Sequence, residues 1–220
     1  MCRLWLGVLL AGFATGICAS AFERGIDDLA VDDAIRFARR ASDADKGGFH
    51  RSYVFTGGAA PLSSISLVTE FRRVVLAAED RLRFGDHLWG AREARDLLRP
   101  VRNTLEIVAD VNFHPQNAYA TVPSYEMRII PKEGPEIRPA NAKITAKYGL
   151  QSVPSPSAPP FYPFPPPTLP IGPGAEPLMG AWVAAVFDGN TLDAKAFVVV
   201  GVSEAGKDLA RISVDLGSVR

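Results

Sequence analysis

The chain has 220 residues, of which 47% are hydrophobic and 22% are charged, a composition typical of globular proteins rather than disordered or membrane proteins. Lys+Arg and Asp+Glu each number 24, so the formal net charge is zero. A general nucleic-acid binder needs an excess of basic side chains, so this balance excludes that class apart from a local basic patch. A chain of this length buries enough apolar surface to fold without a metal ion or a disulfide.

The first 21 residues have the pattern of a secretory signal peptide. Arg3 is a single positive charge, residues 4–10 form an apolar core, and the Ala-Ser-Ala sequence at 19–21 matches a signal peptidase site. We therefore expect cleavage after Ala21. The mature protein is then secreted or periplasmic, with no stable membrane span.

Both cysteines, Cys2 and Cys18, lie inside this segment. A chain cleaved after Ala21 has no thiol, which excludes a disulfide framework, a cysteine nucleophile and a thiolate metal site. Two alternatives to cleavage remain: an uncleaved membrane anchor, and lipid attachment at Cys18. Ile17 disfavours lipid attachment because a lipoprotein signal has a small residue immediately before the cysteine.

Three amphipathic stretches predict helices in the N-terminal part of the mature chain. The first covers Asp27 to Ala41 and is expected to end in the glycine-containing segment 43–48. The second runs from an N-cap at Thr69 to Phe84, with Glu79 and Arg83 four residues apart and able to pair. The third covers Gly90 to Leu98 and stops before Pro100. Between the first two helices, Arg51 to Phe55 and Ser63 to Val68 are either two short strands or a long loop.

Residues 103–132 alternate apolar and polar side chains in two runs, which predicts an antiparallel hairpin. We assign its turn to His114-Pro115-Gln116-Asn117, because proline and asparagine suit turn conformations. Each run is expected to bury one face; the buried positions are Leu105, Ile107, Ala109, Val111 and Phe113 in the first run and Tyr119, Tyr125, Met127 and Ile129 in the second.

Three further strands are predicted near the C-terminus. Gly180 to Phe187 and Ala196 to Val202 are nearly continuous apolar runs, as expected for strands buried on both faces. Leu209 to Leu216 alternates cleanly, and short turns between the three predict an antiparallel meander. Trp182 is accordingly expected in the core. We expect the helix from Thr69 to Phe84 to cover a sheet face, so that helices and strands share one core.

A proline-rich insertion, residues 153–177, separates the two groups of strands. Proline donates no backbone hydrogen bond, so this segment is expected to run over the surface as polyproline II. Phe161, Tyr162 and Phe164 lie within it. These aromatic side chains either pack back against the sheets or bind a partner, and they are the candidate binding residues of the chain.

These patterns predict an α+β fold with a signal peptide at 1–21, a helical part at 22–100 and an antiparallel β-sandwich at 101–220 that contains the proline-rich insertion. In strand number and alternation the sandwich resembles immunoglobulin and fibronectin type III modules in general architecture. The cysteine, tryptophan and tyrosine marks of true immunoglobulin domains are not assignable here.

Catalytic and phosphate-binding motifs are absent from the sequence. His50, His87 and His114 lie far apart in the chain, which favours isolated histidines over a metal site, and no metal ion or other cofactor is predicted. The adjacent carboxylates, at 27–28, 32–33 and 79–80, are interpreted as helix starts and solvated faces. We expect an exported bacterial envelope protein with a non-enzymatic binding or assembly role toward a protein or glycan of the envelope. The alternative is a periplasmic hydrolase whose site combines dispersed residues.

Overall fold

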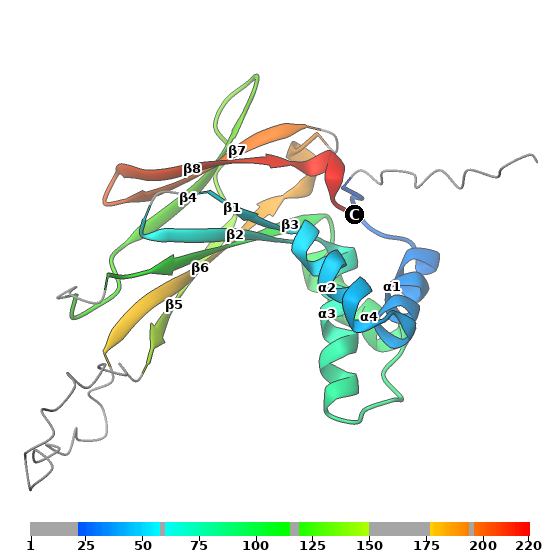
Figure 1. Ribbon diagram of the computed structural model, residues 1–220. Helices are drawn as coiled ribbons and strands as arrows, with labels where there is room; N and C mark the ends of the chain where they lie inside the picture. The colour runs from blue at the N-terminus through cyan, green and yellow to red at the C-terminus, as the bar shows by residue number, and fades with distance from the viewer. Residues whose placement is uncertain (1–21, 58–59, 115–118, 150–176, 194–195) are drawn as a thin grey trace, which may run out of the picture.

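The computed structural model describes residues 22–57, 60–114, 119–149, 177–193 and 196–220. The predicted signal peptide and the proline-rich segment with Phe161, Tyr162 and Phe164 lie outside these ranges. Within them the chain forms four α-helices and two antiparallel sheets, which confirms the α+β class (Figure 1). None of the described helices is long and apolar enough to cross a membrane.

The three predicted helices are present. Side-chain caps define two of their starts: Asp27 accepts a hydrogen bond from the Ala30 amide and Thr69 accepts one from the Arg72 amide. The third helix has Gly90 at its N-cap, which has no side chain to accept a hydrogen bond. The Glu93 carboxylate instead accepts a hydrogen bond from the Gly90 amide at 3.0 Å. The helices are α1 (Asp28–Arg40), α2 (Asp43–Ser52), α3 (Glu70–Arg83) and α4 (Ala91–Leu98).

Helix α2 was not predicted, because its Gly47 and Gly48 each disfavour helix by about 1 kcal/mol relative to alanine. Two tertiary features explain why it forms. Ser42 caps its first turn by accepting a hydrogen bond from the Asp45 amide at 3.2 Å. Phe49 packs against both apolar clusters of the molecule, so its burial opposes the cost of the glycines.

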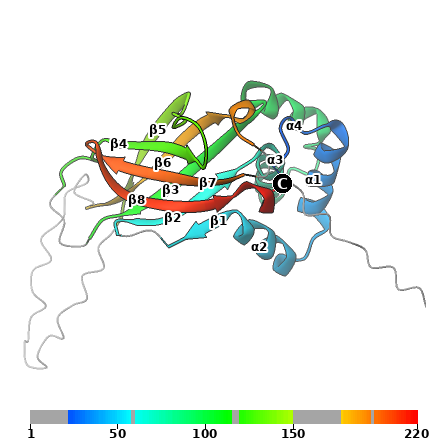
Figure 2. The same cartoon turned by 90° about the horizontal axis from the view of Figure 1, so that it is seen from above.

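The strands form two layers. The order in the five-stranded sheet is β1-β2-β3-β6-β5 and in the three-stranded sheet β4-β7-β8. Figure 2 shows the smaller sheet lying over the larger one, with the helices gathered at one end. The strands are β1 (Val54–Thr56), β2 (Leu62–Val68), β3 (Thr104–Asn112), β4 (Tyr125–Pro131), β5 (Asn141–Tyr148), β6 (Leu178–Asp188), β7 (Phe197–Glu204) and β8 (Lys207–Asp215).

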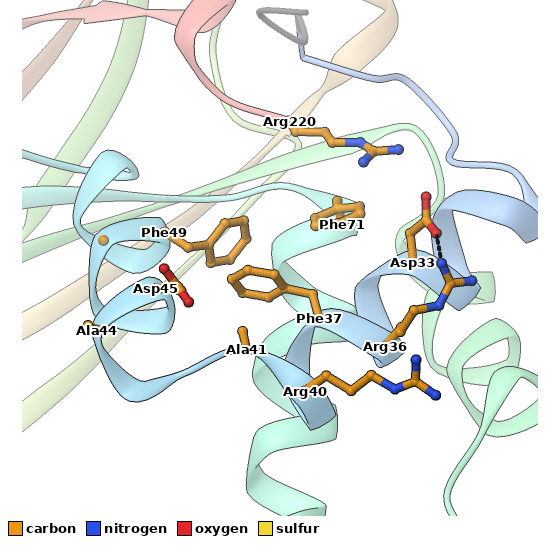
Figure 3. Close-up of a pocket in the computed structure, with 11 residues that line it drawn as sticks. Asp33, Arg36, Phe37, Arg40, Ala41, Ala44, Asp45, Phe49, Phe71 and Arg220 are labelled. Atoms are coloured by element: carbon orange, nitrogen blue, oxygen red, sulfur yellow. Dashed lines mark ion pairs between the residues drawn. The ribbon is translucent and has the colours of Figure 1, made fainter. Parts of the chain in front are cut away.

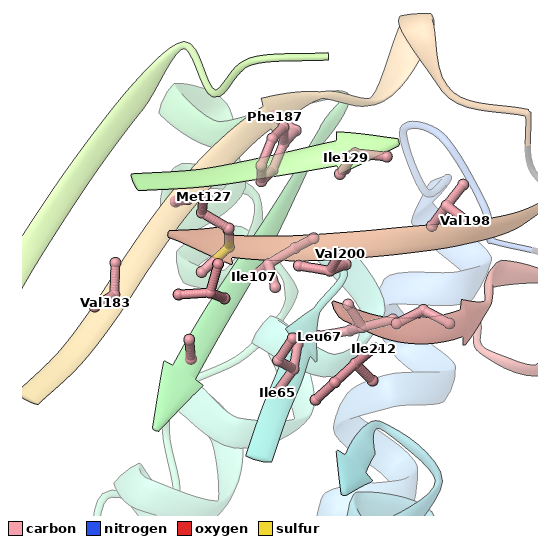
Figure 4. Packing of buried hydrophobic residues seen from close by; sticks show 14 of the residues in the cluster. Ile65, Leu67, Ile107, Met127, Ile129, Val183, Phe187, Val198, Val200 and Ile212 are labelled. Carbon is pink, nitrogen blue, oxygen red and sulfur yellow. The ribbon is translucent and has the colours of Figure 1, made fainter. Parts of the chain in front are cut away.

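The predicted hairpin between the two runs of 103–132 is wrong. Strand β3 pairs with β2 and β6, whereas β4 pairs with β7 in the other sheet. The predicted buried faces are nevertheless confirmed from Leu105 to Phe113 and from Tyr125 to Ile129. They meet across the interior instead of lying side by side, as Ile107, Met127 and Ile129 do in Figure 4. Tyr119 lies before β4 and is exposed.

The predicted meander is half confirmed. Strands β7 and β8 pair through a turn at Ala205 and Gly206, both with positive φ. Strand β6 belongs to the other sheet, where it pairs with β3 and with β5, a strand that sequence alternation did not reveal. The residues between the first two helices form α2, β1 and β2, so the strand alternative holds for Ser63 to Val68.

Buried apolar side chains form two clusters. One lies between the sheets, and the other joins α1, α3 and α4. Helix α3 turns Phe71, Val74 and Val75 into the helical cluster, so it does not cover a sheet face as expected. Phe49 contacts both clusters and marks the junction between helices and sheets.

Candidate functional site

A groove with a volume of about 1190 Å³ opens between α1 and α2 (Figure 3). Helix α1 contributes one wall, helix α2 the other, and Phe71 from α3 lies at its base together with the C-terminal Arg220. The groove therefore lies at the junction where the helical cluster meets the sheets.

Three phenylalanine rings form the floor of the groove. The ring centroids of Phe37 and Phe49 are 4.9 Å apart and those of Phe49 and Phe71 are 6.0 Å apart, both in tilted arrangements. Phe71 is buried, with 5% of its surface exposed, whereas Phe37 and Phe49 are only partly buried. The floor thus presents apolar aromatic surface to an incoming group.

Charged side chains surround this floor, namely three arginines and two aspartates, and Arg220 is also paired with Glu23 at 3.5 Å. Arg36 is paired with Asp33 at 3.1 Å, and Asp45 accepts a hydrogen bond from the Ser42 hydroxyl at 2.6 Å. In the described part of the chain, the exposed Arg40 guanidinium has no ion-pair partner. Figure 3 shows the guanidinium groups of Arg36, Arg40 and Arg220 spread around the rings.

Buried polar groups hold Arg220 at the groove. The Tyr53 hydroxyl donates to the Arg220 carbonyl oxygen at 2.8 Å, and the Thr69 hydroxyl donates to the same oxygen at 2.5 Å. The Arg220 guanidinium carbon lies 4.5 Å from the Phe71 ring centroid, a cation–π contact. Burial raises the pKa of the Tyr53 phenol, although the hydrogen bond with the Arg220 backbone opposes that rise. The phenol is thus a neutral anchor at physiological pH.

Arg72, a buried arginine on α3, has a structural role. Its guanidinium donates to the Leu67 carbonyl oxygen and to the Ser66 hydroxyl, and lies 5.0 Å from the Tyr53 ring centroid. Burial lowers the pKa of Arg72, because removing a cation from water disfavours its charged form. These contacts tie α3 to β2 and fix the base on which Arg220 and Phe71 rest.

The histidines do not converge. His50 Nε2 lies 2.8 Å from Glu79 Oε2, whereas His87 is exposed after α3 and His114 is exposed after β3. The expected pairing of Glu79 with Arg83 is wrong, because Glu79 contacts His50 and Arg83 lies 3.9 Å from Asp80. Among the described residues there is no group of three side chains suited to hold a metal ion.

Sequence patterns did not identify the groove. Its second wall is α2, whose glycines disfavour helix, and its base brings together α3 and a residue distant in the chain. The only local signal was Phe49, an aromatic residue beside two glycines. The predicted binding residues Phe161, Tyr162 and Phe164 lie outside the described residues. Comparison of the chain with protein-family models, curated proteins and solved structures found no match in any of the three.

Proposed function

We propose that this protein is an exported, non-enzymatic binding or assembly protein of a bacterial envelope, and that the groove between α1 and α2 binds a peptide segment of a partner protein. The observation that carries this proposal is the accessible aromatic floor beside Arg40, whose guanidinium has no ion-pair partner within the described ranges. Aromatic and arginine side chains supply most of the binding energy at protein interfaces, especially where apolar surface is buried within a charged rim.

The charge of the groove defines the partner. Arg36 is paired with Asp33 and Arg220 with Glu23, whereas Arg40 has no ion-pair partner among the described residues. An acidic residue on the peptide therefore gains attraction from Arg40, and a basic residue meets repulsion. The rings of Phe37 and Phe49 favour a leucine or phenylalanine side chain on the same peptide. The proposed ligand is therefore a short segment with an apolar side chain next to a carboxylate.

The general architecture of an immunoglobulin-like sandwich is part of the proposal. The strand order supports it: β2-β3-β6-β5 faces β4-β7-β8, which matches the constant-type immunoglobulin arrangement of four and three strands. Strand β1 adds to one edge, and α3 and α4 occupy the connection between the first two strands of that arrangement. Such a framework commonly displays binding residues on its connections.

Export rests on the signal-peptide pattern of residues 1–21. Expression in a bacterial host with an export pathway is expected to release a protein whose first residue is Phe22. Phe22 is buried between the sheets and its amide donates to the Leu216 carbonyl oxygen at 3.2 Å, so the expected cleavage site immediately precedes a packed residue. N-terminal sequencing of the purified protein tests this. An intact Met1 on the protein would contradict cleavage.

Arg40→Glu is expected to weaken peptide binding about tenfold, because it removes an attraction and adds a repulsion worth about 1.4 kcal/mol. The probe is a set of immobilised hexapeptides with leucine or phenylalanine next to aspartate, and a matched set with lysine in place of aspartate. Lys207→Glu is the control, since it makes the same charge change at the start of β8, beside the β7–β8 turn at the end of the sheets opposite the helices (Figure 1). Equal binding of both peptide sets, or no effect of Arg40→Glu, would overturn the proposal.

One observation favours the alternative, a periplasmic hydrolase. The contact between His50 and Glu79 is an imidazole oriented by a carboxylate, the pairing used in general acid–base catalysis. His50 also lies beside the groove, with its ring centroid 5.2 Å from that of Phe49. Hydrolysis of ester, glycoside or peptide substrates that is lost in a His50→Gln variant would favour this alternative. If no product forms from any of these substrate classes, the hydrolase alternative is ruled out.

A further inference from the structure

Trp182 lies on the outer face of the five-stranded sheet, not in the core as its apolar surroundings in the sequence predicted. Its side chain is 46% exposed, whereas Val183 and Phe187 on the inner face of the same strand are fully buried. Alternation along β6 places Gly180 and Ala184 on either side of it on the outer face. Both neighbours are small, so the indole has no large side chain beside it along the strand.

Polar side chains from the adjacent strands surround the indole. In the sheet register Trp182 is opposite Asp110 on β3 and Thr145 on β5, while Gly180 is opposite Asn112 and Lys147. The Lys147 ammonium group donates to the carboxylate of Asp110 and to the side-chain oxygen of Asn112. The same ammonium lies 5.3 Å from the Trp182 ring centroid. The outer face thus combines one aromatic surface with several hydrogen-bonding groups.

Gly180 is required for this arrangement. A Cβ atom at position 180 would lie 2.1 Å from the Val111 carbonyl oxygen and 2.7 Å from Lys147 Cε. Any side chain there would displace the lysine stem, which crosses this position to reach Asp110 on the far strand. The strand therefore leaves open the space that brings the ammonium group, the carboxylate and the indole together.

We propose that this outer face binds a neutral carbohydrate, with Trp182 as the stacking platform. A sugar ring presents a C–H face that packs against an aromatic ring, and hydroxyl groups around its edge that exchange hydrogen bonds with carboxylate, amide and ammonium groups. Lys147 and Asp110 form an ion pair and balance each other's charge beside the indole, so the exposed Lys143, opposite Ala184 on the same face, is the remaining formal charge near Trp182. A neutral glycan uses the hydrogen-bonding groups of this face without supplying a charge of its own. This site is separate from the groove, whose residues come from the helices and Arg220.

The test is titration of the mature protein with neutral oligosaccharides, namely β-1,4-linked glucose, mannose and N-acetylglucosamine hexamers, and with oligogalacturonate as the anionic counterpart. Binding is followed by calorimetry and by tryptophan fluorescence. Trp182 is expected to dominate the fluorescence change, because Trp89 is only 8% exposed. At least one neutral hexamer is expected to bind, with a loss of tenfold or more in Trp182→Ala and partial retention in Trp182→Phe.

Phe84→Ala is the matched control, because Phe84 is an exposed aromatic residue, 79% accessible, at the end of α3. It is expected to leave carbohydrate binding unchanged, as is the groove variant Arg40→Glu. Failure of every neutral hexamer to bind would overturn the proposal, as would equal affinity for oligogalacturonate or an unchanged affinity in Trp182→Ala. None of these results bears on peptide binding in the groove, so the two proposals fail independently.

Discussion

Replacing Phe187 by alanine is expected to lower the free energy of unfolding by about 3–5 kcal/mol. Phe187 is fully buried and is among the largest side chains between the two sheets (Figure 4). Strand β6, which carries it, pairs on both sides, so the backbone has little freedom to collapse into the cavity that alanine would leave. Urea denaturation gives the change in stability directly, and an unchanged dependence on urea concentration would show that the folded state is otherwise intact.

Trp182→Ala on the same strand is the paired comparison. Because Trp182 is half-exposed on the outer face, its loss is expected to cost about 1–2 kcal/mol, clearly less than the loss of Phe187. This contrast also allows the carbohydrate experiment to be interpreted. If the Trp182→Ala protein remains folded and stable, a loss of affinity reflects binding and not unfolding. A Trp182→Ala variant as destabilised as Phe187→Ala would place the indole in the core and contradict the assignment of the two faces.

Glu70→Ala is expected to destabilise the protein by about 3–5 kcal/mol, because it leaves two backbone amides without their charged acceptor. Glu70 is only 2% exposed, and its two carboxylate oxygens accept from the Ile26 amide at 3.0 Å and the Asn103 amide at 2.5 Å. It is the first residue of α3, where the helix dipole favours a negative charge. One carboxylate thus joins the segment before α1, helix α3 and the start of β3.

Amide hydrogen exchange provides a second, local test of the role of Glu70. Beyond the global loss of stability, the amides of Ile26 and Asn103 are expected to exchange faster in Glu70→Ala, because each loses its acceptor. Glu133→Ala, a change at an exposed glutamate between β4 and β5, is the control and is expected to alter stability by less than about 0.5 kcal/mol. If Glu70→Ala behaved like the control, the carboxylate would not be the bridge inferred here.

The sequence predicted well those features that depend on local chemistry. The N-cap at Thr69, together with 3.6-residue periodicity, located three helices. Alternation identified the buried faces of β3, β4 and β8. Each of these signals lies within a few residues of the feature that it defines, so no knowledge of distant neighbours is needed.

The alternation of apolar and polar residues did not predict which strands pair with each other. Alternation with a period of two residues shows which face of a strand is buried. It does not show whether two such strands are neighbours in one sheet or lie opposite each other in two layers. Residues 114–117 were therefore interpreted as a hairpin turn, whereas β3 and β4 belong to different sheets. Trp182 was misplaced for a related reason: Gly180, Ala184 and Val186 share its face, and these apolar residues make a half-exposed face look buried.

By itself the sequence determined the α+β class, three of the helices and the inner faces of β3, β4 and β8, because local propensity and periodicity depend only on nearby residues. The tertiary structure alone decided that α2 forms, which sheet each strand joins, and where aromatic groups become accessible. The groove joins Phe37, Phe49, Phe71 and Arg220, and the outer face joins Trp182 with Asp110 and Lys147. Both sites combine residues distant in the chain, and only the packing of helices and sheets brings such residues together.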